Sequence, residues 1–247
     1  MTIKTRISIM ALLGLITSIA ALIIAGKTVF GYRSGELHFV TALSDFEWAA
    51  YIGLVAVVLS LTGLWLSRPS GTHRGFFPGF LGLILSLPIA IYIVNFEYSA
   101  YAYPPINDIT TNIDEPPSFW EVANPVAYPG PEVAELQRQG YPDIKPIKLG
   151  IDIAQAFKIA SALAHDMDWE VISEDVDERQ IEAVATSFLF GFKDNVVIRL
   201  QDSNGLTQVD LRSYSSLGNI DRGANAKRIR AYLRSMKQRA SALALGM

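Results

Sequence analysis

Three long apolar runs occupy most of the first hundred residues. Residues 7–25 and 48–66 each comprise 19 residues without a charged side chain, and residues 76–96 comprise 21. An α-helix rises about 1.5 Å per residue, so roughly 20 apolar residues cross the hydrocarbon layer of a membrane. Pro88, inside the third run, is compatible with a membrane helix. The pattern predicts a membrane domain over residues 1–98 with three transmembrane helices.

Small residues recur along the first two runs. The first contains Gly14, Ser18 and Ala21, and the second contains Gly53, Ala56 and Gly63. Two interpretations are open at this point. Small side chains allow membrane helices to approach closely, or these residues are low-bulk apolar filler.

The last hundred residues show helical periodicity at both ends and alternation between them. Apolar residues repeat at intervals of three and four over residues 151–167, which predicts a helix with Asp152 as its N-cap. Alternation predicts strands at residues 169–174, 180–192, 194–201 and 206–214. Asn204 and Gly205 form a strong hairpin signal because both accept positive φ. A final helix is predicted at about residues 221–240.

The short connections between these strands favour an antiparallel meander, since parallel strands need long crossovers. The predicted fold class is therefore N-terminal transmembrane α-helices followed by an α+β soluble domain at residues 151–247. That domain has a four-stranded antiparallel meander sheet and two helices, in the order α-β-β-β-β-α. Phe188, Phe190 and Phe192 share one face of the second strand, as core residues or as the wall of an apolar ligand pocket.

Residues 99–150 connect the two parts and hold nine of the twelve prolines. Proline fixes its own φ and favours extended geometry in the preceding residue. A disordered linker is normally poor in aromatic residues, whereas this one contains Phe119, Trp120, Tyr128 and Tyr141. We expect it to wrap the soluble domain and pack on it, with a short helix near residues 131–139.

Charge indicates where the soluble part lies. From Glu97 onward the chain has 21 acidic and 15 basic residues, while the whole chain has a net charge of −3. Lys4, Arg6, Arg68 and Arg74 flank one side of the predicted helices, against Lys27 and Arg33 on the other, and no basic residue follows the third helix until Arg138. By the positive-inside rule, we expect a multi-pass membrane protein with a cytoplasmic N-terminus and a C-terminal domain on the other side of the membrane. A cleaved first run, with Lys4 and Arg6 as the start of a signal peptide, remains an alternative that leaves the soluble part on the same side.

The densest polar chemistry lies between residues 199 and 228. Asp210 and Arg212 share a face of the fourth strand, and Arg199 is expected beside them on the neighbouring strand. These residues form either a cross-strand ion pair or an arginine pocket for a carboxylate or phosphate. The other candidate ligand-binding residues are polar and follow along the chain: Ser213, Ser215, Asp221, Asn225 and Arg228. Asp221 is also the expected N-cap of the last helix, and Asn225 is expected to bond back to the preceding loop.

The last helix has a basic stripe next to its apolar face, formed by Lys227, Arg230, Arg234 and Lys237. One interpretation is a solvated face that balances an acidic domain. The other is contact with anionic lipid headgroups or another anionic partner. A nucleic-acid partner is not expected, because the domain is acidic overall.

Recognised catalytic and metal-binding patterns are absent from the sequence. There is no Cys, and the three His residues, His38, His73 and His165, are scattered. No HExxH, GxSxG or GxGxxG motif occurs. We therefore predict no metal and no cofactor.

The soluble part resembles a bacterial family called domain of unknown function 1499, over about residues 106–240. Short matching pieces include Asp108-Ile109-Thr110-Thr111, Trp169-Glu170-Val171, Phe190-Gly191-Phe192-Lys193-Asp194 and Val197-Ile198-Arg199. The most specific piece is Asp210-Leu211-Arg212-Ser213 followed by residues 218–229. Ser216 stands where the family often has Arg, which argues against a scheme that needs an arginine there. The resemblance implies no activity, and some members carry membrane helices ahead of the domain. Because the family is bacterial, the resemblance also implies a location in the bacterial inner (cytoplasmic) membrane, with the C-terminal domain in the periplasm.

Three functions are compatible with these observations. The first is a membrane-anchored cell-envelope module that binds a lipid, an anionic ligand or a partner protein. The second is a hydrolase or transferase that uses Asp210 or Asp221 as a base, with arginines stabilising an anion. The third is a structural membrane protein. The oligomeric state is left open.

Overall fold

The computed structural model describes residues 6–71 and 73–245. The chain divides into two compact units, Met1–Tyr98 and Ser99–Met247. The first contains the strands β1 (Arg6–Ile7) and β2 (His73–Arg74) and the helices α1 (Ile9–Arg33) and α2 (Phe39–Leu66). The helix α3 (Phe76–Ala102) begins in the first unit and ends in the second. All three helices are long and apolar enough to cross a membrane.

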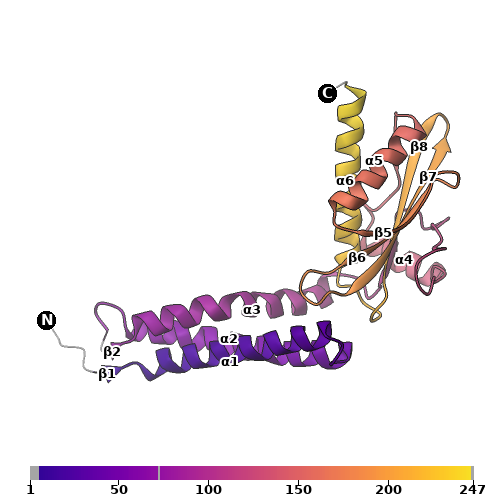
Figure 1. Cartoon of the computed structure of the whole chain (residues 1–247). Helices are drawn as coiled ribbons and strands as arrows, with labels where there is room; N and C mark the ends of the chain where they lie inside the picture. The colour runs from indigo at the N-terminus through magenta and orange to yellow at the C-terminus, as the bar shows by residue number, and fades with distance from the viewer. Residues whose placement is uncertain (1–5, 72, 246–247) are drawn as a thin grey trace. The chain divides into compact units, whose positions relative to one another are not determined.

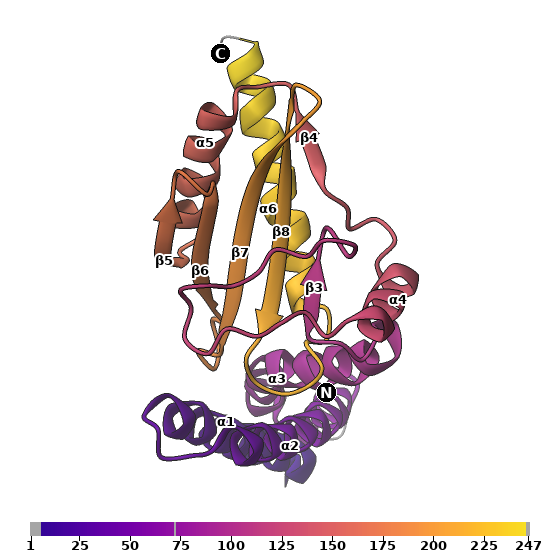
Figure 2. The same cartoon turned by 90° about the vertical axis from the view of Figure 1, so that its right-hand side faces the viewer.

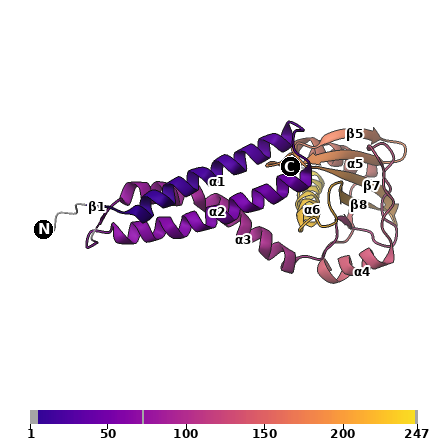
Figure 3. The ribbon, with the colours of Figure 1, turned by 90° about the horizontal axis from the view of Figure 1, so that it is seen from below.

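Small residues lie where these helices touch, and α1 and α2 run side by side (Figure 3). A Cβ added at Gly63 would lie 2.5 Å from Cα of Ala11, and one at Gly82 would lie 2.9 Å from the backbone N of Leu15. The Ser18 hydroxyl donates to the Gly82 carbonyl oxygen at 2.9 Å. The small residues therefore permit close helix packing. This supports the first interpretation of the sequence over the second, in which they are low-bulk apolar filler.

The second unit is an α+β domain (Figure 1). Its meander consists of β5 (Glu170–Asp175), β6 (Gln180–Thr186), β7 (Lys193–Ser203) and β8 (Leu206–Ser215). The predicted antiparallel order is confirmed, since each of these strands pairs with the next. The helices are α4 (Pro131–Gly140), α5 (Ile153–Asp166) and α6 (Ala224–Ala244).

The predicted strand count was wrong, because the sheet has six strands. Two three-residue strands from the proline-rich segment, β3 (Asp108–Thr110) and β4 (Ile147–Leu149), both pair antiparallel with the outer edge of β8. Between them, Thr111 and Leu211 continue the pairing, with the Thr111 N–H donating to the Leu211 carbonyl at 2.8 Å. Strands of three residues carry too little alternation to be recognised in a sequence.

Among the residues that the structure describes, helices cover one face of the sheet (Figure 2), where α5 and α6 pack against it. Ile181, Ile198, Val209 and Leu211 point into this core and are completely buried. Alternation sends Gln180, Glu182, Arg199, Asp210 and Arg212 to the opposite face, so that face is polar.

The predicted second strand ends earlier than its phenylalanines indicated. β6 stops at Thr186, and residues 187–192 form a turn closed by the Ser187 N–H, which donates to the Phe192 carbonyl at 2.8 Å. Gly191 has φ of 76°. Phe190 is buried and stacks on Phe192, whereas Phe188 is 96% exposed. The shared face predicted for the three phenylalanines is therefore wrong, because a turn breaks the alternation.

Candidate functional site

The polar face of the sheet is crossed by residues 112–128, called here the covering segment (Figure 2). Side chains of the sheet form hydrogen bonds with the backbone of the covering segment. The Glu182 carboxylate accepts the N–H groups of Trp120, Glu121 and Val122 at 2.7, 3.0 and 3.0 Å. The Gln180 amide donates to the Ser118 carbonyl at 3.0 Å. The sheet therefore holds an extended piece of its own chain through hydrogen bonds to the backbone.

Arg212 is enclosed at the centre of this face, with 1% of its surface exposed. Its Nε and Nη2 donate to the two oxygens of Asp108 at 2.9 and 2.7 Å. Nη1 donates to the Pro117 carbonyl and Nη2 also donates to the Val126 carbonyl, each at 3.1 Å. The Phe119 ring lies 4.7 Å from the guanidinium carbon. All three guanidinium nitrogens are used within the chain, and Arg212 ties the covering segment to the sheet.

Asp108 is a residue that site prediction from the sequence missed. It is fully buried beside Arg212, although 104 positions separate the two in the chain. Burial raises the pKa of the Asp108 carboxyl, and the Arg212 guanidinium opposes that rise. The available signal was the Asp108-Ile109-Thr110-Thr111 piece of the family resemblance, which pointed to this position but did not assign a role to Asp108.

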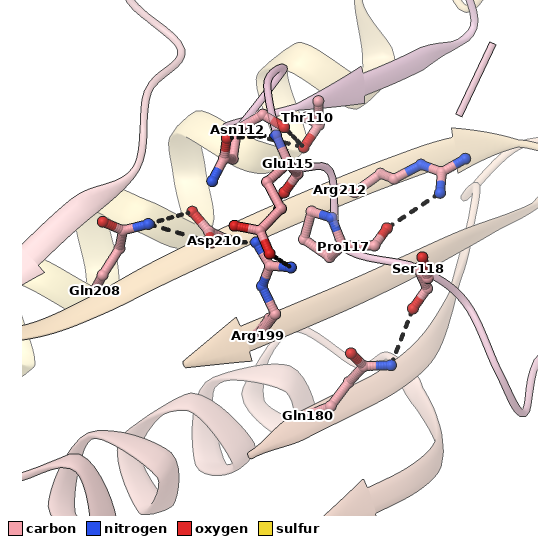
Figure 4. Close-up of polar contacts among 10 residues, drawn as sticks. All are labelled: Thr110, Asn112, Glu115, Pro117, Ser118, Gln180, Arg199, Gln208, Asp210 and Arg212. Atoms are coloured by element: carbon pink, nitrogen blue, oxygen red, sulfur yellow. Dashed lines mark hydrogen bonds and ion pairs between the residues drawn. The ribbon is translucent and has the colours of Figure 1, made fainter. Parts of the chain in front are cut away.

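Asp210 pairs with Arg199 and not with Arg212 (Figure 4). Arg199 lies directly opposite Asp210 in the β7–β8 register, and its Nη2 donates to the carboxylate at 2.8 Å. The same nitrogen donates to the Glu115 carbonyl at 2.8 Å, and the Gln208 amide approaches Asp210 at 3.2 Å. The Asp210 carboxylate is completely buried. This geometry is that of a cross-strand ion pair under the covering segment.

The remaining predicted residues form a second cluster on the helix-covered face. Ser213 donates to Asn225 at 2.7 Å, and the Asn225 amide donates to Ser215 at 2.9 Å. Arg228 reaches across to Asp194 at 2.7 Å. Because successive residues of β8 point to opposite faces, the structure divides the predicted site into two clusters.

The N-cap position predicted for Asp221 is wrong, because α6 begins at Ala224 and its N-cap is Gly223 with φ of 81°. The Asp221 side chain nevertheless binds the start of the helix. Its carboxylate accepts the N–H groups of Gly223 at 2.9 Å and Asn225 at 2.7 Å. Burial raises the pKa of Asp221, and these two backbone bonds oppose the rise. The predicted bond from Asn225 back to the preceding loop is the one to Ser215.

A cavity of about 470 Å³, called here the edge cleft, lies where β3 ends and β4 begins. An adjoining cavity of about 570 Å³ shares Ile113, Asp114 and Arg138 with it. The edge cleft is lined by the residue after β3 and by residues of the covering segment, α4, the chain leading to β4, and β8: Thr111, Asn112, Ile113, Asp114, Gln137, Arg138, Tyr141, Pro142, Ile144, Lys145, Pro146 and Gln208.

The polar groups of the edge cleft differ in how far they are already engaged. Both ends of the Gln137 amide bond the backbone of Thr110, at 2.9 and 2.6 Å. Arg138 pairs with Glu135 and keeps about half of its side chain exposed. Lys145 is exposed and has no ion pair within the part of the chain that the structure describes. Arg138 and Lys145 are therefore the groups open to a ligand, and both come from the segment that sequence reasoning treated as a connection.

The predicted basic stripe on α6 is partly engaged. Arg230 forms a bidentate pair with Asp143 at 2.6 and 2.7 Å. The Lys227 ammonium lies 5.6 Å from the centre of the Tyr103 ring. Arg234 and Lys237 are exposed. Residues 6–71 and 73–245 contain no group of three or more His, Asp or Glu positioned to hold a metal ion.

Three apolar helices and a mostly antiparallel α+β domain define a membrane-associated protein of mixed architecture. The sequence model of the family described as "Protein of unknown function (DUF1499)" matches residues 108–236, more than half of the chain. The chain belongs to this family. The match includes Asp108, the edge cleft and all of β8. Comparison of the sequence with curated proteins gave no match.

Proposed function

We propose that this protein is a membrane-anchored binding module of the bacterial cell envelope, and that the edge cleft receives its ligand. In this proposal residues 1–98 form the anchor, residues 99–150 cover the sheet and build the cleft, and residues 151–247 supply the scaffold. The observation that carries the proposal is the pair of accessible cations, Arg138 and Lys145, at a cavity of about 470 Å³. Small-molecule sites commonly have volumes of about 300–1,000 Å³.

The ligand class follows from the lining of the edge cleft. A guanidinium and an ammonium favour a carboxylate or phosphate group. Tyr141, Ile144 and Pro146 supply apolar surface for the rest of the molecule. Arg138 already pairs with Glu135, so Lys145 is the cation of the edge cleft that has no ion-pair partner among the described residues. We therefore propose a small polar ligand with one anionic group.

The engagement of the two candidate bases favours binding over hydrolysis or group transfer. Asp210 accepts hydrogen bonds from Arg199 and Gln208 beneath the covering segment. Asp221 accepts two backbone N–H groups at the start of α6. Neither carboxylate lines the edge cleft, and a general base must reach the proton that it removes.

We also propose that the N-terminus is cytoplasmic and that the soluble unit lies outside the cytoplasm, in the periplasm of a bacterial cell. The support is the excess of Lys and Arg on one side of the apolar helices, with Lys4, Arg6, Arg68 and Arg74 against Lys27 and Arg33. An envelope location is consistent with a ligand that reaches the cleft from outside the cell.

Thermal unfolding of the intact protein in detergent micelles, titrated with inorganic phosphate, tests the site. Binding to the folded state raises the melting temperature. We expect phosphate to stabilise the natural protein and the Lys148→Glu control, in which an exposed lysine of β4 outside the cleft is reversed. Lys145→Glu should lose the response. An equal response in Lys145→Glu and Lys148→Glu would refute the site.

A further inference from the structure

We propose that one end of the soluble unit rests on the lipid surface and inserts an apolar tip, formed by Phe188, Leu189 and Ile220, into the headgroup region. The exposed fractions of these side chains are 96%, 36% and 48%. A fully exposed phenylalanine at the end of a hairpin keeps a large apolar area in water. This proposal concerns the bilayer and does not depend on a ligand in the edge cleft.

The three residues of the apolar tip lie at the same end of the sheet. Phe188 and Leu189 belong to the turn between β6 and β7. Asp194, near the start of β7, pairs with Ser215, the last residue of β8. The loop that carries Ile220 begins directly after Ser215. The β6–β7 turn and the β8–α6 loop are therefore neighbours.

The chain enters the soluble unit from α3 at this same end. Arg222 of the β8–α6 loop donates to the Ser99 hydroxyl at 3.3 Å. A Cβ added at Gly223 would lie 3.0 Å from the Tyr103 ring. The Asp221 N–H donates to the Ile106 carbonyl at 3.2 Å. The last turn of α3 and the residues after it thus pack on the loop that carries Ile220, so the chain passes from the third apolar helix directly into this end of the soluble unit. This continuity is the reason why we place the apolar tip at the lipid surface.

The two ends of the meander differ in composition, as a lipid contact at one end requires. The turn between β5 and β6, at the opposite end of β6, reads Val176-Asp177-Glu178-Arg179. The hairpin between β7 and β8, also at that end, contains Asp202 and Asn204. The turn between β6 and β7 reads Ser187-Phe188-Leu189-Phe190-Gly191-Phe192 and has no charge. Aromatic rings favour the headgroup level of a bilayer.

This placement changes which part of α6 approaches lipid. The N-terminus of α6 lies beside Tyr103, and Lys237 is 14 residues beyond Gly223, or roughly 20 Å along the helix axis at about 1.5 Å per residue. Contact with headgroups would therefore be made by the apolar tip and the start of α6, and the far part of the basic stripe would face solvent.

Site-directed spin labelling tests the proposal, because the chain has no Cys and each variant carries a single label. Phe188→Cys probes the tip. Val176→Cys is the matched control, since Val176 is also apolar, 67% exposed and in a hairpin turn at the opposite end of β6. The intact protein is reconstituted in vesicles of phosphatidylethanolamine and phosphatidylglycerol. Collision rates of each label with oxygen, which partitions into lipid, and with a water-soluble nickel chelate are then measured by power saturation.

We expect the oxygen-to-nickel collision ratio to be several-fold higher at position 188 than at position 176. Equal ratios would show that the tip is in water and would overturn the proposal. Shielding of the 188 label from both reagents would indicate contact with protein and would overturn it as well. Phe188→Ser should leave the melting temperature in detergent unchanged, because the side chain is 96% exposed.

Discussion

At the scale of single residues, the main finding is that Arg212 and Asp108 form a buried, bidentate ion pair. Removing two charges from water is costly, and their attraction offsets this cost only when the geometry is good and the remaining donors are satisfied. Here the remaining donors reach the carbonyls of Pro117 and Val126. The role of this pair is therefore to fix the path of the covering segment rather than to bind a ligand or catalyse a reaction.

Breaking this pair from one side should be costly. Arg212→Met leaves Asp108 buried without its partner, so we expect the free energy of unfolding to fall by about 3–5 kcal/mol. The double variant Asp108→Leu/Arg212→Met should lose less than the sum of the two single losses, since no uncompensated charge remains. Urea unfolding of the intact protein in micelles, followed by tryptophan fluorescence, measures these changes.

The control for this cycle is Arg234→Met, which removes an exposed arginine of α6. It should change the free energy of unfolding by no more than about 0.5 kcal/mol. Strictly additive losses from Asp108→Leu and Arg212→Met would contradict the interpretation, because they would mean that the two side chains are not energetically coupled.

At the scale of elements, the covering segment behaves as a peptide held by a polar sheet face. Glu182 is 1% exposed and binds three consecutive backbone N–H groups. These bonds are charge-assisted, and bonds to charged groups contribute about 1.5–3 kcal/mol each in favourable cases. The segment therefore does not need regular secondary structure of its own to be ordered.

Glu182→Gln should loosen the covering segment while keeping the shape of the side chain. Loss of the negative charge weakens all three hydrogen bonds from the backbone N–H groups. The new side-chain amide group also points a hydrogen at a backbone N–H donor. We expect faster hydrogen exchange at Trp120, Glu121 and Val122, measured by mass spectrometry of peptides from the intact protein. The comparison variant is Glu170→Gln on β5, whose side chain is 60% exposed. Unchanged exchange in Glu182→Gln would show that other contacts hold the segment.

The membrane helices provide a second prediction at this scale. Gly63→Leu places a side chain where even a Cβ would lie 2.5 Å from the backbone of Ala11, so α1 and α2 must separate. Gly26→Leu adds the same side chain where no atom lies within 4 Å. We expect a lower melting temperature in detergent for Gly63→Leu and almost none of that loss for Gly26→Leu. Equal effects would argue against close packing at Gly63.

At the scale of the whole molecule, the proposed orientation concerns a chain that combines three helices long and apolar enough to cross a membrane with an α+β domain. An odd number of spans puts the N-terminus and the soluble unit on opposite sides. The side is set by flanking Lys and Arg residues and not by the fold of the domain.

Alkaline phosphatase fusions test the proposed orientation, because this enzyme is active only outside the cytoplasm. A fusion after Met247 should be active, and a fusion after Gly71, between the second and third helices, should be inactive. The opposite pattern would reverse the orientation. A fusion after Gly35 should be active if the first apolar helix remains in the mature protein and spans the membrane.

The sequence by itself determined the features that rest on local patterns. Uninterrupted apolar runs predicted the membrane helices, and alternation with Asn204-Gly205 predicted the antiparallel meander. Asp152 was recognisable as a cap, and its carboxylate accepts the Ala154 N–H at 2.8 Å. The dense motif around Asp210 identified the family. Each of these signals lies within about twenty residues, where helix and strand periodicity act.

Only the tertiary structure decided which distant groups meet. The pairing of Arg212 with Asp108 and of Glu182 with Trp120 spans 104 and 62 positions. Sequence periodicity does not reveal the contacts of an irregular, proline-rich segment, because the backbone N–H and C=O groups of such a segment are paired with side chains of another element. The edge cleft depends on the same fact: it exists because β3 and β4 meet end to end beside β8, and that arrangement arises from the folded chain as a whole.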